Sequence, residues 1–266
     1  MNLLNIPVLK YTGAVSSKID EKVAVEEPLE IFINDESFYM TMRMPGEEIP
    51  LSLGLCFTEG IIDSMDDVAG ANYCSDLSAN KINVYLSEKK KKEGPISQRQ
   101  KRFTTYSSCG ICGSDMIREL GKSVSGIQEK TQMHISMMSV MQDALMAKQD
   151  AYRGTGGTHA AAIFSSAGDL LSFSEDVGRH NALDKAIGKL LFAGKIKDAA
   201  IVMLSSRLSY EMVMKCARLG VEILAGFSAP TSLGVELADK TGITLIGLVR
   251  GNKGNIYTHP DRIRLD

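Results

Sequence analysis

Two cysteines separated by two residues are the side chains of this chain most able to do chemistry. Cys109 and Cys112 are flanked by glycines, which leave the backbone open and let a reactant approach both thiols. The Ser-Asp pair at 114–115 can cap a helix over 116–120, and the positive end of a helix favours thiolates. Such a pair serves as a redox dithiol, as half of a zinc site, or as a nucleophile that carries sulfur. The spacing alone does not distinguish these uses.

The other cysteines, the net charge and the distribution of apolar residues limit the class of protein to which this chain can belong. The other three cysteines, Cys56, Cys74 and Cys216, are interpreted as structural, and five cysteines in 266 residues predict reduced thiols rather than a disulfide framework. A net charge of −2 gives no broad basic surface, so we expect no nucleic acid as partner. No apolar run is long enough to span a membrane, and the first residues lack a signal peptide. We therefore expect a cytoplasmic protein that binds no membrane.

The elements that must position the cysteines begin with a strand-rich first half. Alternating apolar residues predict strands at 29–33, 38–42 and 81–86, with a hairpin turn at 34–36 and a helix at 48–59. Residues 88–102 hold seven lysines and arginines around a Gly-Pro pair, which predicts a solvated loop. The alternative for this loop is docking of an acidic partner or a phosphate-bearing ligand.

The second half alternates strands and helices. Strands are predicted at 160–164, 170–174, 200–204, 222–225 and 243–249, and helices at 135–152, 177–191, 208–219 and 232–240. Because strands joined through helices lie parallel, we expect a parallel sheet and an α/β fold class.

Three of these strands end in polar or basic clusters, at 205–207, 228–232 and 250–254. The carboxyl ends of parallel strands meet at one edge of a sheet, and the helix starts that follow attract phosphates. This edge is predicted to bind a phosphorylated ligand. The alternative is that helix capping and turn formation account for each cluster separately.

Residues 174–181 concentrate further polar side chains at a strand-to-helix junction. His180 is predicted to act as an acid or base, and Asp176 to orient either His180 or Arg179. The alternative is an Asp–Arg pair that only supports the fold. The glycine-rich loop at 154–159 lets a backbone approach a ligand but lacks the Lys-Ser/Thr ending of a P-loop.

These segments together resemble the FdhD family of formate dehydrogenase accessory proteins. The matching stretches are residues 26–30, 42–46, 108–113, 156–161, 175–181, 228–232, 249–251 and 255–260. The resemblance implies a cytidine-deaminase-like three-layer α/β/α domain over 131–266. A smaller strand-rich α+β domain over 1–130 precedes it and ends in the basic loop and the Cys-x-x-Cys segment. The resemblance also implies a homodimer.

The resemblance further implies a sulfurtransferase that carries sulfur to a molybdenum cofactor. Cys109 would accept sulfur from a cysteine desulfurase as a persulfide, and Cys112 would assist the transfer or relay the sulfur. The recipient would be bis-molybdopterin guanine dinucleotide, bound as substrate before its insertion into formate dehydrogenase, and a guanine nucleotide such as GDP would occupy the same site. The residues expected to bind it are Arg179, His180, Ser205, Arg207, Ser228, Thr231, Leu248, Val249, Arg250, Gly251, Asn252 and Lys253. Leu248 departs from the family, where an aromatic residue is expected.

Other functions fit the residues less well. A zinc deaminase needs His-x-Glu and Pro-Cys-x-x-Cys, whereas here Ala161 stands at the Glu position and Pro230 is followed by Thr231. A cofactor chaperone with a structural metal-binding dithiol stays open, although one Cys-x-x-Cys supplies only two of the four zinc ligands and we expect no bound metal. A thioredoxin-like oxidoreductase would need the dithiol at a strand-to-helix junction.

Overall fold

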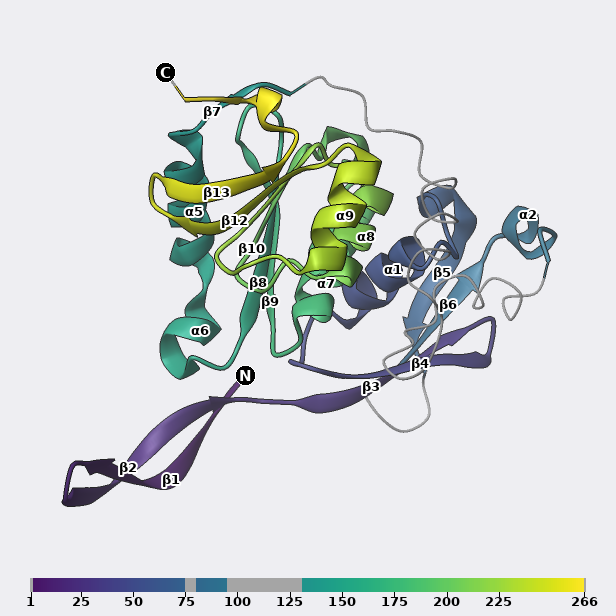
Figure 1. The fold of residues 1–266 in the computed structure, drawn as a ribbon. Helices are drawn as coiled ribbons and strands as arrows, with labels where there is room; N and C mark the ends of the chain where they lie inside the picture. Colours follow the sequence, from purple (N-terminus) through teal and green to yellow (C-terminus); the bar gives the residue numbers. More distant parts are fainter. Residues whose placement is uncertain (1, 75–79, 95–130, 266) are drawn as a thin grey trace.

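The structure, a computed structural model, describes residues 2–74, 80–94 and 131–265. A central six-stranded sheet of order β13-β12-β11-β10-β8-β9 dominates the second half of the chain (Figure 1). Its strands are β8 (His159–Phe164), β9 (Leu170–Asp176), β10 (Ile201–Leu204), β11 (Ile223–Gly226), β12 (Thr244–Arg250) and β13 (Lys253–Thr258). The helices of this half are α5 (Met137–Lys148), α6 (Asp150–Thr155), α7 (Arg179–Phe192), α8 (Tyr210–Leu219) and α9 (Ser232–Thr241). The fold is therefore mixed α/β.

A second, four-stranded sheet forms in the first half, with the order β4-β3-β6-β5. Its strands are β3 (Glu27–Ile33), β4 (Glu36–Arg43), β5 (Val68–Tyr73) and β6 (Lys81–Leu86), and α1 (Glu48–Thr58) follows β4. The predicted hairpin, helix and third strand of this half are confirmed. The short elements are α2 (Glu88–Lys91), β7 (Met133–His134), β14 (Ile263–Arg264) and the 3-10 turns Met65–Asp67, Ile196–Asp198 and Pro260–Arg262.

The expectation that all strands of the second half lie parallel is wrong for β8, which is reversed between β9 and β10. Strands β10, β11 and β12 are parallel, but β8 lies antiparallel to both β10 and β9. A tight turn closed by the Ser165 N–H donating to the Asp169 carbonyl connects β8 to β9, so these two strands form a hairpin without a crossover helix. The antiparallel direction puts the start of β8 and the end of β9 at the same edge as the carboxyl ends of β10 to β12.

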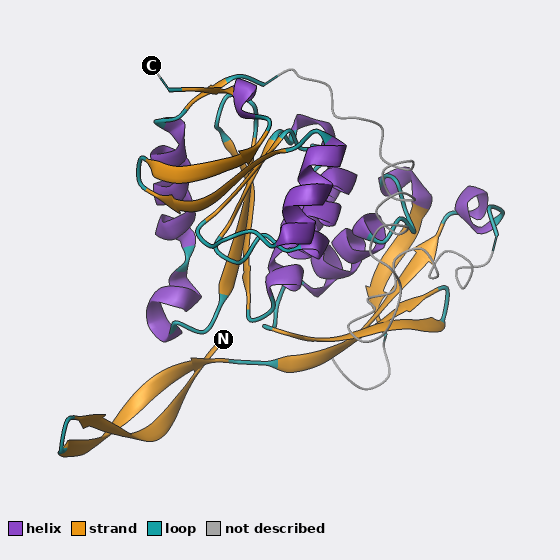
Figure 2. Ribbon diagram, in the orientation of Figure 1, coloured by secondary structure: helices purple, strands orange, loops and turns teal. Residues whose placement is uncertain are grey.

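Helices cover both faces of the central sheet (Figure 2). Side chains alternate along β8, so that Ala160, Ala162 and Phe164 pack with α5 while Ala161 and Ile163 face α7 and α8. The cluster of buried apolar side chains on the α7 side of the sheet continues through α1 to the apolar face of the four-stranded sheet. One hydrophobic core therefore connects the two sheets by way of α1 and α7.

Two glycines allow α1 and α7 to pack with their backbones in close approach. A Cβ at Gly54 would lie 1.8 Å from the Asp184 carbonyl oxygen, and a Cβ at Gly188 would lie 1.8 Å from the Pro50 carbonyl oxygen. Any side chain at either position would force the two helices apart.

The basic segment differs from the predicted solvated loop where it is described. Residues 88–91 form α2, and Lys90 is buried with its ammonium 2.6 Å from Asp63 and 3.1 Å from Glu93. Asp63, on a distant turn, and the neighbouring Glu93 thus neutralise a charge that local composition assigned to solvent. Residues 95–102 lie outside the described residues, as does the helix expected at 116–120. The helix predicted at 135–152 divides at Gln149 into α5 and α6.

Sequence reasoning missed a hairpin at the N-terminus, formed by β1 (Leu3–Thr12) and β2 (Val15–Ala24). It extends away from the body of the molecule in Figure 1, and β2 contacts α6. Gly13 turns the chain between the two strands at a φ of 63°. The alternation of Leu4, Ile6 and Val8 was the available signal.

Candidate functional site

The polar clusters that follow β10, β11 and β12 meet at one edge of the sheet, as predicted. The Leu208 N–H donates to the Ala229 carbonyl (3.2 Å), and the Thr231 N–H donates to the Leu208 carbonyl (3.1 Å). The Leu248 N–H donates to the Ser228 carbonyl (3.2 Å). Backbone hydrogen bonds therefore join the three loops side by side.

Two of the predicted binding hydroxyls are occupied by structural contacts. Thr231 caps α9, because its hydroxyl accepts from the Gly234 N–H at 3.2 Å. The Ser205 hydroxyl accepts from the Ala160 N–H at 2.9 Å and ties the loop after β10 to the start of β8. The Thr231 contact agrees with the capping alternative, and the binding roles of both residues stay predictions.

The β8–β9 hairpin adds a second group of side chains to this edge. His159 begins β8 and lies opposite Asp176, the last residue of β9. Arg179 and His180, at the start of α7, follow Asp176 after two residues. His159 was not among the predicted site residues. The glycine-rich loop before it was noticed, but only the antiparallel direction of β8 brings it to this edge.

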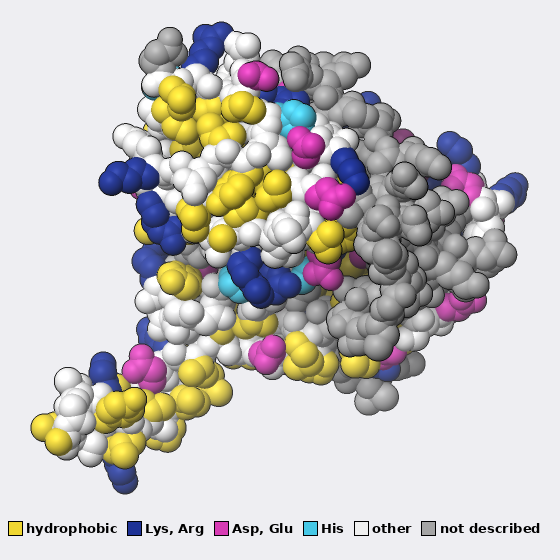
Figure 3. Space-filling model, viewed as in Figure 1, with side chains coloured by type: hydrophobic (Ala, Val, Ile, Leu, Met, Phe, Trp, Pro, Cys, Tyr) yellow, Lys and Arg dark blue, Asp and Glu magenta, His cyan; other side chains and the backbone are white. Residues whose placement is uncertain are grey.

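His159, Arg179, His180 and Arg207 form a basic cluster. Burial lowers the pKa of His159, and the charges of Arg179, Arg207 and His180 lower it further. Arg207 is exposed, and no ion pair of Arg207 is found among the described residues. Figure 3 shows Lys, Arg and His side chains gathered on this side of the molecule with acidic side chains beside them. The cluster has the composition of a site for an anion.

One carboxylate lies against the basic cluster. Glu211, in the first turn of α8, has its Oε2 2.6 Å from His180 Nε2 and 3.9 Å from Arg179 Nη2. The hydrogen bond from His180 lowers the pKa of Glu211, with a further contribution from the charge of Arg179. Glu211 was also missed, and nothing in its local sequence distinguishes it from an ordinary first-turn acidic residue.

The two acidic residues before α7 support the fold and do not orient His180 or Arg179. Glu175 accepts hydrogen bonds from the N–H groups of Ala151 and Tyr152, both at 3.0 Å, at the start of α6. Asp176 is fully buried and pairs with Lys185 Nζ at 2.7 Å. The predicted orienting role of Asp176 is therefore wrong.

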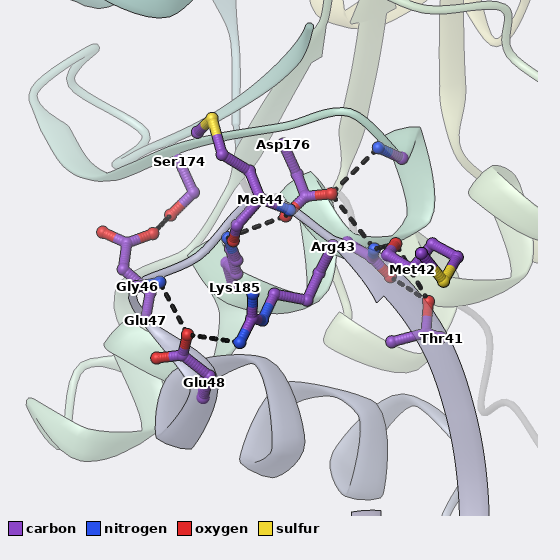
Figure 4. Close-up of polar contacts among 12 residues, drawn as sticks. Thr41, Met42, Arg43, Met44, Gly46, Glu47, Glu48, Ser174, Asp176 and Lys185 are labelled. Atoms are coloured by element: carbon purple, nitrogen blue, oxygen red, sulfur yellow. Dashed lines mark hydrogen bonds and ion pairs between the residues drawn. The ribbon is translucent and has the colours of Figure 1, made fainter. Parts of the chain in front are cut away.

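Asp176 instead joins the start of α7 to the segment between β4 and α1 (Figure 4). Its carboxylate accepts from the N–H groups of Met44 (3.1 Å) and Gly178 (2.9 Å). Lys185 Nζ donates to the Met44 carbonyl at 2.8 Å, and Asn181 Nδ2 donates to the Met42 carbonyl at 2.8 Å. The first turn of α7, which carries Arg179 and His180, is thus fixed by the 42–44 segment.

The segment 248–253 lies where β12 turns into β13. Leu248 is 42% exposed and has a φ of 58°, a left-handed conformation that bulky residues rarely adopt. Arg250 Nη1 donates to the Phe227 carbonyl at 2.6 Å, and its guanidinium lies 5.9 Å from the centre of the Phe227 ring. The Gly251 N–H donates to Gln142 of α5 at 2.7 Å, while Val249 is buried and Asn252 and Lys253 are exposed at the turn.

The dithiol lies outside the described residues, so the assignments of Cys109 and Cys112 stay predictions. Cys56 and Cys216 are fully buried, and burial raises the pKa of the Cys56 thiol to about 12 and that of Cys216 still higher. Neither is available as a nucleophile near neutral pH, in agreement with their structural interpretation. Among the helices that the structure describes, none is long and apolar enough to cross a bilayer.

Comparisons with known proteins agree over nearly the whole chain. The model of the FdhD/NarQ family matches residues 24–264. Relatives named sulfur carrier protein FdhD include one from Saccharolobus solfataricus, 41% identical with 96% of each chain covered, and one from Sulfolobus acidocaldarius, 38% identical with 100% of each covered. A crystal structure of a candidate formate dehydrogenase accessory protein from Desulfotalea psychrophila has a TM-score of 0.79 and covers 99% of this chain and 100% of its own. Its 24% identity supports the fold alone. With the family model and the full-length relatives in agreement, the chain belongs to the FdhD/NarQ family.

Proposed function

We propose that this protein is a sulfur carrier for a molybdenum cofactor. The name shared by its full-length relatives, sulfur carrier protein FdhD, supports sulfur transfer as the activity. The basic cluster at the sheet edge supports an anionic substrate, because two arginines and two histidines gather there and, among the described residues, Glu211 pairs with only two of them, Arg179 and His180. This convergence is the observation that carries the choice of ligand.

In the proposed cycle, the Cys109 thiolate attacks the outer sulfur of a persulfide on a cysteine desulfurase. The bond between the two donor sulfurs breaks, the donor cysteine leaves as a thiolate, and Cys109 becomes the persulfide with no net oxidation. Cys112 then either takes the outer sulfur by the same exchange or attacks Cys109 Sγ. The second route releases hydrosulfide and leaves a Cys109–Cys112 disulfide.

The recipient is the guanine dinucleotide form of the molybdenum cofactor, held as substrate before it enters formate dehydrogenase. Arg179, Arg207 and His180 would neutralise its diphosphates, and the exposed side chain of Leu248 would contact a guanine base. GDP would occupy the same place. A cytidine-deaminase-like arrangement of the second half, supported by helices on both faces of the mixed sheet, and a cytoplasmic homodimer are parts of this proposal.

Mass spectrometry of the intact protein tests the sulfur transfer. After incubation with a cysteine desulfurase and cysteine, we expect the native chain to gain one sulfur that a reductant removes. The gain should disappear in Cys109→Ala and persist in Cys74→Ala, the matched control. In the native chain, sulfur found on Cys112 would indicate relay, whereas loss of two hydrogens would indicate the internal disulfide. No gain, with free thiols and an active desulfurase, would favour the chaperone with a metal-binding dithiol.

A further inference from the structure

The imidazole of His159 is half-buried between the two groups of loops that form the sheet edge. On one side, the Ser205 N–H donates to the Ala160 carbonyl at 3.0 Å, which holds the loop bearing Arg207 against the start of β8. On the other side, Asp176 pairs with His159 in the sheet register and is followed by Arg179 and His180. An anion bound between Arg207 on one side and Arg179 and His180 on the other would therefore lie close to the His159 imidazole.

The charged groups in the elements around His159 are positive or already paired with another residue. From α7 come Arg179 and His180, and from the loop after β10 comes Arg207. From β9 comes Asp176, whose buried carboxylate is paired with Lys185. From α8 comes Glu211, which is bound to His180. The neutral imidazole is therefore the stable form of His159 before a ligand binds, because a proton there would add to the repulsion among the existing positive charges.

A bound diphosphate reverses the sign of this environment. Its two negative charges compensate Arg179 and Arg207, and its oxygens accept hydrogen bonds from an imidazolium better than from a neutral ring. Phosphate oxygens only accept hydrogen bonds. Both ring nitrogens of a protonated imidazole can donate to them, whereas a neutral imidazole has one nitrogen that can only accept. We propose that His159 belongs to the diphosphate-binding site of this protein and takes up one proton when a guanosine diphosphate ester binds.

This inference rests on the proposed function for the presence of a guanine nucleotide at this edge. It adds a binding residue, His159, and a proton that accompanies the ligand. The consequence is that ligand affinity falls by about tenfold per pH unit over the range in which His159 is neutral in the free protein and charged in the complex.

The test is isothermal titration calorimetry with diguanosine pyrophosphate, whose phosphates are diesters and do not titrate near neutral pH. Binding at pH 7.5 is measured in two buffers with different enthalpies of ionisation, and the difference in heat gives the number of protons exchanged. We expect uptake approaching one proton by the native chain and none by His159→Gln. His180→Gln, the matched control, should keep the uptake even if its affinity is lower.

A second readout needs no variant. The chain has only four histidines, so their ring C–H signals can be followed individually by NMR as the pH is changed with and without the ligand. One imidazole should shift toward the protonated form on binding. Binding with no proton uptake, or uptake retained in His159→Gln, overturns the role of His159 alone. No binding of the native chain to diguanosine pyrophosphate overturns the proposed guanine-nucleotide site, and the role of His159 with it.

Discussion

At the scale of single residues, the position of a charge matters more here than its presence in a motif. Asp176 and His180 lie four residues apart in the motif, yet the first is buried in an ion pair and the second faces the sheet edge. Local sequence assigns both residues to one junction. Their separation in the fold depends on Lys185 of α7 and on Met44, which comes from a distant segment of the chain. For this reason the residue types of the site were predictable from the sequence. Which of them support the fold and which lie at the sheet edge was not.

Glu59 provides a prediction at this scale. It follows α1, and burial raises its pKa to about 7, with Asp184 and Glu211 adding to the rise and Lys215 opposing it. The folded protein therefore binds this proton more tightly than the unfolded chain does, whose carboxyl titrates near 4.5. The stability contributed by the protonated group is present below the unfolded pKa and is lost as the pH rises from about 4.5 to about 7.

Replacement of Glu59 by glutamine should remove this dependence of the stability on pH. We expect Glu59→Gln to raise the free energy of unfolding by about 3 kcal/mol at pH 8 and by less than about 1 kcal/mol at pH 5. Urea denaturation followed by far-ultraviolet circular dichroism at the two pH values measures this. Glu36→Gln, at an exposed position of β4, is the control and should change little at either pH. Equal stabilisation at both pH values would contradict a titrating Glu59.

At the scale of elements, periodicity predicted the helices and strands well but not their directions. The parallel run β10, β11 and β12 follows from strands joined through helices, and sequence patterns identify such units. The reversed direction of β8 does not follow, because the pairing of β8 with β10 joins strands that α7 separates along the chain. Helix α2 was missed for a similar reason, since Asp63 neutralises Lys90 from 27 residues away in sequence.

The contact of α1 with α7 leads to a prediction about Gly54. In Gly54→Ala, the new methyl group would overlap the Asp184 carbonyl, so the helices must separate and the core between them loosens. We expect a loss of about 3 kcal/mol in the free energy of unfolding, at the upper end for overpacked cores. Chemical denaturation measures it.

Gly70→Ala is the matched control for this substitution. The nearest atom to a Cβ at Gly70 is the side-chain nitrogen of Asn72 at 3.7 Å, an ordinary contact. Its effect should stay within about 1 kcal/mol. If Gly54→Ala were as stable as Gly70→Ala, the close approach of the two helices would be refuted.

At the scale of the whole molecule, the first and second halves of the described chain share one core and one buried polar connection. Leu29 and Ile31 of the small sheet belong to the same hydrophobic cluster as Leu183 and Ile187 of α7. Lys185 binds both Asp176 of the second half and the Met44 carbonyl of the first. The domain boundary at 130/131 stays a prediction, but these contacts favour unfolding of both halves together.

Calorimetry tests this coupling. We expect the native protein to unfold in one transition, and Lys185→Met to unfold in one transition at a lower temperature. The substitution leaves Asp176 buried without its cation, at a cost of about 3–5 kcal/mol. Lys240→Met, which breaks an exposed pair with Glu236 on α9, is the control and should change the transition temperature little. Two transitions, of which Lys185→Met moves only one, would show that the halves unfold independently.

The left-handed backbone at Leu248 has an evolutionary consequence. Glycine would adopt this conformation without strain, whereas a leucine costs about 1–2 kcal/mol there. Its half-exposed side chain recovers little of that cost by burial. Selection for folding alone would favour glycine at this position, because burial of the leucine side chain gains too little to offset the strain of its backbone.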